Sequence, residues 1–215
     1  MITIKQQKLY EILDDKNNRI WGGIQYWFPK EGYIPNGACG ATTGANILSY
    51  IVRTRKELDA KSNHQTKDGF LDFMKESYKY MYPRVVGLLA EFFVIGINDF
   101  AKAIGVAMHA DHLKIHIGRA CRPSLEKVSS FITESLKKDI PVAFLILSNG
   151  ATPGLDSWHW VTIIGLDEKT NIANIVDNGR LLTADISRWL DTSIMGGSFI
   201  RLVPDSLDSS LSANA

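Results

Sequence analysis

The sequence predicts an α+β fold in which helices come first and an antiparallel β-sheet follows. Between residues 39 and 103 apolar residues recur at helical spacing, whereas between residues 140 and 204 apolar runs alternate with short turns. Short turns between consecutive strands are typical of antiparallel pairing. With 215 residues, 45% of them hydrophobic, the chain is long enough to bury a large core. We expect one domain over residues 1–204, with a helical lobe at about 20–105 and a sheet lobe at about 106–204.

The first long helix is expected to begin at Cys39. A Pro-Asn-Gly turn precedes this cysteine, and apolar residues follow it at helical spacing over residues 47–52. Free N–H groups at a helix N-terminus favour a thiolate over a thiol and can hydrogen-bond an oxyanion. Cys39 is therefore a candidate nucleophile. On this helix alone, the alternative of an inert buried thiol stays open.

The other elements are predicted from the period of their apolar residues. They are helices at 70–81 and at 85–95 or 97–103, a strand at 109–118, an amphipathic helix that Ser124 caps, and strands at 140–147, 158–167, 172–177 and 198–204. Gly87 and Gly96 interrupt the apolar run of the second helix. The polar, serine-rich tail at 205–215 is expected to be disordered.

Composition argues against several classes of partner and location. A net charge of +1 gives no reason to expect nucleic acid, and no apolar stretch approaches the ~20 residues that span a bilayer. The charged N-terminus shows no secretory signal, so we expect a cytoplasmic protein. Cys39 and Cys121 are the only cysteines, too few for a disulfide framework, and Cys121 is expected to be structural.

The sequence offers a histidine as a base for the cysteine and an aspartate that can orient the histidine. A thiolate nucleophile needs a base, and the base needs a group that orients it. His159 begins one predicted strand and Asp177 ends the next, and the two lie symmetrically about the turn between them. A hairpin therefore predicts His159 and Asp177 side by side across the ladder. A surface pair without catalytic meaning is the alternative.

The order of Cys39, His159 and Asp177 resembles that of papain-like cysteine peptidases over about residues 20–204. The stretches NGACGATTGANIL and HWVTIIGLDEKTNIANIVDNG are most similar to the bacterial branch that contains the double-glycine leader peptidases of bacteriocin export and their stand-alone relatives. The third member of the triad in that branch is Asp. The resemblance implies a papain-like fold, a peptide or protein substrate, and amide cleavage through a Cys39 thioester without a cofactor.

The sequence departs from the family around the nucleophile. It lacks the tryptophan that follows the cysteine in lysosomal enzymes, and Tyr33 stands six residues before Cys39, where the family usually has a glutamine that donates to the oxyanion. Gln25 or Asn36 is the expected substitute. The nearby aromatic residues Trp27 and Trp158 are candidates for walls of the substrate cleft, although ordinary packing would also explain them. We expect segments 22–35 and 148–157 to overhang the site.

Three other interpretations compete with this one. An acyltransferase or transglutaminase uses the same triad, and a binding module can use the same fold without catalysis. A metal site at His109, Asp111, His112 and His116 is disfavoured, because the alternating pattern predicts a strand in which these side chains lie too far apart to share one ion. We expect no membrane partner, and the sequence does not predict the oligomeric state.

Overall fold

A computed structural model describes residues 1–55, 63–85 and 87–205. Its helices are α1 (Cys39–Thr54), α2 (Lys67–Tyr80), α3 (Ala90–Ala103), α4 (Leu125–Lys137) and α5 (Ile186–Thr192). Its strands are β1 (Ile2–Thr3), β2 (Glu11–Leu13), β3 (Arg19–Trp21), β4 (Met108–Ile115), β5 (Val142–Ile146), β6 (His159–Leu166), β7 (Ile172–Asp177), β8 (Arg180–Asp185) and β9 (Gly197–Pro204). Short 3₁₀ turns occupy Gln7–Tyr10, Gln25–Trp27, Pro35–Gly37 and Arg119–Cys121.

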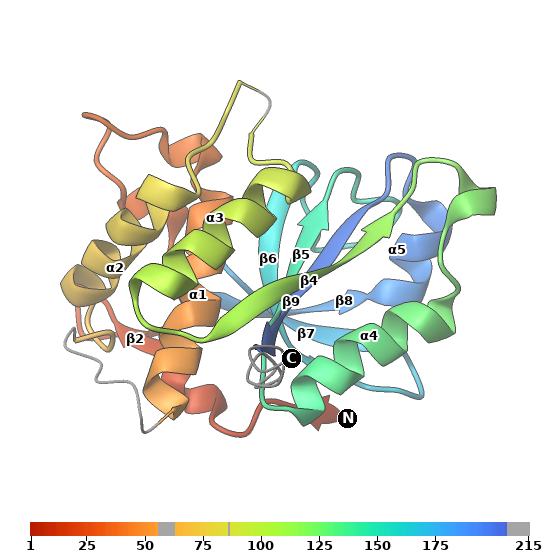
Figure 1. The fold of residues 1–215 in the computed structure, drawn as a ribbon, viewed down its shortest axis with the longest axis horizontal. Helices are drawn as coiled ribbons and strands as arrows, with labels where there is room; N and C mark the ends of the chain where they lie inside the picture. The colour runs from red at the N-terminus through yellow and green to blue at the C-terminus, as the bar shows by residue number, and fades with distance from the viewer. Residues whose placement is uncertain (56–62, 86, 206–215) are drawn as a thin grey trace, which may run out of the picture.

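The α+β class and the order of helices before sheet are confirmed. Figure 1 shows α1, α2 and α3 together on one side of the molecule, with the sheet, α4 and α5 on the other. The seven-stranded antiparallel sheet has the order β4-β9-β5-β6-β7-β8, and β1 pairs with β6. The division into two lobes within residues 1–204 stays a prediction, and the tail from residue 206 lies outside the described residues.

The central strand β5 separates two cores. All five of its residues are buried, and they alternate between the sheet faces as a pleated strand requires. Ala143 and Leu145 pack into the core under α1, α2 and α3, whereas Val142, Phe144 and Ile146 pack into the core that contains residues of α4 and α5. Because both faces of β5 are covered, its sequence is continuously apolar.

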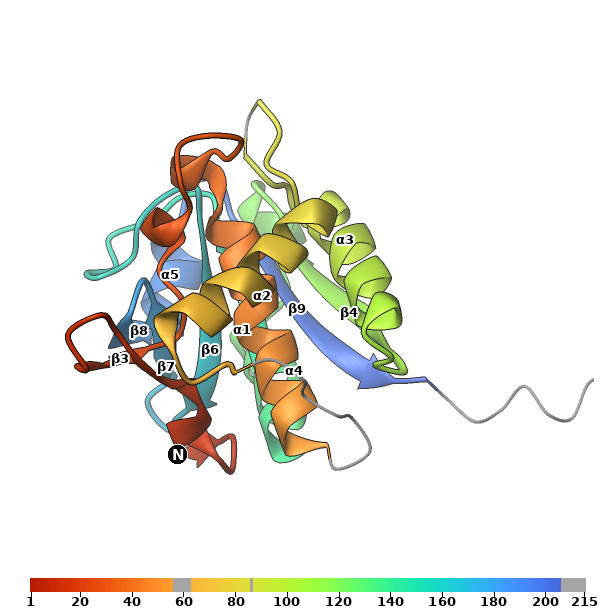
Figure 2. The ribbon, with the colours of Figure 1, turned by 90° about the vertical axis from the view of Figure 1, so that its left-hand side faces the viewer.

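Helix α1 lies between α2 and β6, as Figure 2 shows. Fourteen of its residues, from Cys39 to Val52, are buried. A Cβ atom added at Gly40 would collide with Leu88, and one at Gly44 would collide with Met81. The small residues at the start of α1 therefore let neighbouring segments approach its backbone. Within the described ranges, no helix has both the length and the apolar character that crossing a bilayer requires.

One prediction about the elements was wrong, and two elements were missed. Helix α3 runs unbroken through Gly96, because this glycine admits the Tyr80 carbonyl at close range instead of ending the helix. Strand β8 and helix α5 were not predicted. The strand follows a two-residue turn at Asn178 and Gly179, and Asp185 caps the helix by accepting a hydrogen bond from the Arg188 N–H group.

Candidate active site

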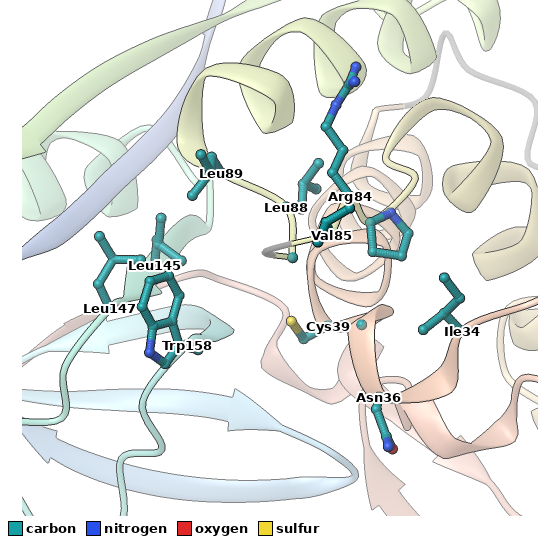
Figure 3. Close-up of a pocket in the computed structure, with 13 residues that line it drawn as sticks. Ile34, Asn36, Cys39, Arg84, Val85, Leu88, Leu89, Leu145, Leu147 and Trp158 are labelled. Atoms are coloured by element: carbon teal, nitrogen blue, oxygen red, sulfur yellow. The ribbon is translucent and has the colours of Figure 1, made fainter.

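Cys39 is the first residue of α1, as its sequence context predicts. Its side chain is buried, with 8% of the residue exposed, and it faces a groove (Figure 3). The preceding Ala38 has no side chain that can cap the helix. The first N–H groups of α1 therefore have no capping side chain at this position, and the positive end of the helix dipole lies at the sulfur.

His159 and Asp177 are hydrogen-bonded. His159 Nε2 donates to Asp177 Oδ1 over 2.7 Å, and both residues are buried. Cys39 lines the same small cavity as His159 and Asp177, and because Nε2 is bonded to Asp177, Nδ1 is the ring nitrogen available to the sulfur. The structure thus brings Cys39, His159 and Asp177 together from α1, β6 and β7.

The predicted register of His159 and Asp177 was wrong by two residues. Thr162 pairs with Val176, so Asp177 continues opposite Val161 and lies diagonal to His159. The cause is the position of the turn: Leu166 pairs with Ala173, so the hairpin is centred between Lys169 and Thr170 and not on Glu168. An irregularity between Ile163 and Gly165 then moves the ladder one residue back toward the predicted pairing. Diagonal neighbours on one face remain within reach of long side chains, and the hydrogen bond forms.

The surroundings of His159 favour its protonated form. Burial by itself lowers the pKa of His159, but the hydrogen bonds from the ring to Asp177 and Cys39, with the charges of these two groups, raise the pKa to about 10. An imidazolium is therefore favoured at neutral pH. An imidazolium beside a cysteine at a helix N-terminus is the arrangement that stabilises a thiolate.

Asp177 has further neighbours. Its Oδ1 atom also accepts a hydrogen bond of 3.0 Å from Asn178 Nδ2. Arg180 Nη2 lies 3.5 Å from Asp177 Oδ2, but the arginine side chain is 60% exposed, so solvent screens much of this attraction. The carboxylate is thus held mainly by His159 and Asn178.

The two candidates for the oxyanion donor are placed differently. Gln25 is buried, its N–H group donates to Asn178 Oδ1 over 3.1 Å, and its Oε1 atom has no hydrogen-bond partner among the described residues. Asn36 is exposed, and its amide points away from the Cys39 sulfur in Figure 3. The geometry therefore favours Gln25 over Asn36 as a fixed group, and the role itself stays a prediction.

A groove of about 460 Å³ opens beside Cys39. Leu88 and Leu89 line one side, and Leu145, Leu147 and Trp158 line the other (Figure 3). An adjoining groove of about 470 Å³ shares Leu89, Leu145 and Leu147, and continues to Ile117 and Met195. Because they share these leucines, the two form one continuous, largely apolar surface that leads away from the cysteine.

Of the two tryptophans predicted to form the cleft, Trp158 lines the groove and Trp27 packs partly buried against the core that contains Cys39. Trp158 is 53% exposed and has a φ of 57°. A positive φ is strained for a bulky residue, and such strain is concentrated at functional sites. The strained backbone holds the indole at the mouth of the groove, immediately before His159.

Residues 83–85 and 87–89, between α2 and α3, are a part of the site that the sequence did not predict. Pro83, Arg84, Val85 and Leu88 line the groove, whereas segment 148–157 lines none of it within the described chain and segment 22–35 contributes Ile34. The expectation that segments 148–157 and 22–35 overhang the site stays a prediction. These residues have no periodic pattern, and only Gly87, with a φ of 82°, signals the turn that brings them there.

The histidines considered for a metal site have other partners. His109 Nδ1 lies 2.9 Å from Asp205 Oδ1, and His112 Nε2 lies 2.9 Å from Ser198 Oγ. Asp111 accepts from Arg201, and no group of three or more potential ligands converges in the described parts of the chain. Cys121 is exposed and lies on the adjoining groove.

No protein-family model matches the sequence, and no curated protein sequence matches it. Three solved structures resemble the chain in fold. The peptidase domain of Streptococcus ComA, a bifunctional ABC transporter involved in a quorum-sensing pathway, is 14% identical with a TM-score of 0.45, over 80% of this chain and 95% of that chain. A double-glycine motif protease from an AMS/PCAT transporter, solved with its leader peptide, is 13% identical with a TM-score of 0.43, over 78% and 84%.

The third is the N-terminal peptidase C39-like domain of the toxin secretion ATP-binding protein from Vibrio parahaemolyticus. It is 13% identical with a TM-score of 0.39, over 76% of this chain and 97% of that chain. All three are peptidase or protease domains, the kind that the sequence resembles.

Proposed function

We propose that the protein is a cysteine peptidase that cleaves an amide bond through a thioester on Cys39. The observation that carries this proposal is the buried hydrogen bond from His159 to Asp177, in a small cavity that Cys39 also lines. A base oriented by a carboxylate and aligned on a sulfur is the arrangement that nucleophilic catalysis requires. A cysteine that serves only in packing does not require an oriented base beside its sulfur.

In the proposed reaction the Cys39 thiolate attacks the carbonyl carbon, and a carbon–sulfur bond forms. The Cys39 N–H group and Gln25 are the proposed donors to the oxyanion. The His159 imidazolium gives its proton to the leaving amine, and the neutral ring then takes a proton from the water that hydrolyses the thioester. Asp177 keeps the ring oriented and stabilises its positive charge in both steps.

The substrate we propose is a peptide segment with apolar side chains. The groove beside Cys39 is lined by leucines, Trp158 and Ile34, and it continues past Leu89 toward Ile117. An extended backbone places alternate side chains on one side, so a bound strand would present every second residue to this surface. Val85, Trp158 and Ile117 are exposed, which leaves apolar area free for contact.

Trapping of the acyl-enzyme tests the proposed function. The protein is mixed with p-nitrophenyl acetate at neutral pH, and the acetylated residue is located by mass spectrometry of peptides. We expect acetyl on Cys39, with release of p-nitrophenolate, in the wild type and in Cys121→Ser, and no such acetylation in Cys39→Ser. Equal labelling of the exposed Cys121, or slow labelling that does not discriminate between the two thiols, would favour a non-catalytic binding module.

Truncation of Trp158 tests the proposed groove. We expect Trp158→Ala to weaken the preference for p-nitrophenyl hexanoate over p-nitrophenyl acetate by about fivefold, since the longer acyl chain would lose about 1 kcal/mol of apolar contact. The measurement is kcat/KM for both esters. Tyr26→Ala is the matched control, because Tyr26 is 62% exposed and does not line the groove. An unchanged preference in Trp158→Ala would remove Trp158 from the substrate surface.

A further inference from the structure

We infer that Asn178 is a positioning residue that fixes the segment carrying Gln25 against the carboxylate of Asp177. The inference rests on the proposed function, because it assigns Asn178 a task within the same site. The inference adds Asn178 to the proposed site, although neither the chemistry of an amide nor the order of the triad points to this residue.

The two ends of the Asn178 amide bind different parts of the site. Its Nδ2 atom donates to Asp177 Oδ1 over 3.0 Å, the same oxygen that accepts from His159. Its Oδ1 atom accepts from the N–H group of Gln25 over 3.1 Å. One side chain therefore joins the group that orients the base to the residue proposed to stabilise the oxyanion, across 153 positions of sequence.

The turn that carries Asn178 is built to hold it in place. Asp177 pairs with Arg180, so Asn178 and Gly179 form a two-residue hairpin loop with φ of 44° and 78°. Two positive φ values define a type I′ turn, for which Asn-Gly is the preferred sequence. The Gly179 carbonyl also accepts from the Trp21 N–H group over 2.9 Å. The turn therefore accepts two hydrogen bonds from the segment that leads to Gln25, one from the Trp21 N–H group and one from the Gln25 N–H group.

Asn178 also lies close to the reacting groups. It lines a small cavity together with Cys39, His159 and Asp177. Without its side chain, the Gln25 N–H group loses its acceptor and Asp177 loses one donor. Because Gln25 follows Trp21 in a short loop, release of this anchor is expected to displace the Gln25 amide while the hydrogen bond between His159 and Asp177 remains.

Two reactions of Cys39 separate this role from general damage. Alkylation by iodoacetamide is a direct displacement of iodide and forms no oxyanion, so it reports on the thiolate alone. Acylation by p-nitrophenyl acetate passes through an oxyanion and also needs the donors. A residue that positions Gln25 must therefore affect acylation more than alkylation.

The test is Asn178→Gly, which removes the amide and keeps a residue that adopts positive φ without strain. We expect the acylation rate to fall about tenfold, while alkylation at pH 7 changes less than about twofold. In a Gln25→Ala background, Asn178→Gly is expected to slow acylation further by less than about twofold, since the group it positions is already absent. The control is Asn17→Gly, another asparagine with a φ of 60°, in the β2–β3 turn.

The outcomes are distinguishable. If Asn178→Gly acylates as fast as Asn17→Gly, or if acylation and alkylation fall equally, the positioning role is wrong and the proposed function stands. If the factors by which Asn178→Gly and Gln25→Ala slow acylation multiply in the double variant, Asn178 does not act through Gln25. If the wild type is not acylated at Cys39 at all, both the proposed function and this inference are overturned.

Discussion

Replacing His159 with alanine is expected to slow the alkylation of Cys39 by iodoacetamide about 30-fold at pH 7 and about 300-fold at pH 6. In the wild type the sulfur is expected to be ionised throughout this range by its pairing with the imidazolium. Without the imidazole, an ordinary thiol of pKa near 8.5 is about 3% ionised at pH 7 and about tenfold less at pH 6. The rate is measured by mass spectrometry of the Cys39 peptide.

The control for this variant is His109→Ala, which removes a histidine from another His–Asp pair. His109 lies 2.9 Å from Asp205, and both side chains are more than half exposed. We expect Cys39 in His109→Ala to react at the wild-type rate. Cys121 serves as a reference thiol in every sample. If Cys39 reacts equally fast in His159→Ala and His109→Ala, then His159 does not ionise the cysteine.

Removing the carboxylate of Asp177 is expected to have the second large effect. We expect Asp177→Ala to slow acylation about a hundredfold at pH 7, because the base loses both its orientation and its counter-charge. Asp177→Asn keeps an oxygen that can accept from His159 and removes only the charge. We expect Asp177→Asn to slow acylation at pH 7 less than Asp177→Ala does. Thermal unfolding shows whether both variants remain folded.

The pH dependence of His159 follows from the same pair. Its pKa is raised to about 10, with Asp177 and Cys39 as the groups that favour the proton and Arg180 as the nearby cation. Loss of the negative charge in Asp177→Asn must lower the pH at which the ring loses its proton. Nuclear magnetic resonance of the ring nitrogens is expected to show a midpoint that moves from about 10 toward the ordinary 6.5. A midpoint that stays near 10 would mean that Asp177 does not stabilise the imidazolium.

The elements around Cys39 could be predicted because their signals are local. A turn, small residues and a helical apolar period fix the start of α1 at the cysteine. Counting along a hairpin predicted that His159 and Asp177 lie close together, but it did not predict the register in which their strands pair. The turn is centred between Lys169 and Thr170 and not on Glu168, and the ladder shifts again between Ile163 and Gly165; counting residues along the sequence reveals neither position.

Other parts of the site depend on tertiary packing. The side of the groove formed by residues 83–85 and 87–89 is held in place because Leu88 packs on Gly40 and the Leu88 carbonyl accepts from Trp160 Nε1 over 2.8 Å. Such contacts join positions that are far apart in sequence and leave no periodic pattern. The β7–β8 turn is different, since Asn178-Gly179 is a strong hairpin signal that would have predicted β8.

The most direct test of the account is the ionisation of Cys39 in Cys121→Ser, in which Cys39 is the only cysteine. The ultraviolet absorbance of thiolate is followed as the pH is raised, with Cys39→Ser/Cys121→Ser as the blank. We predict one thiolate already present at pH 6, which disappears when His159→Ala is added. If thiolate instead appears only as the pH passes about 8.5, as for an ordinary thiol, Cys39 and His159 do not form the ion pair on which the proposed activity depends.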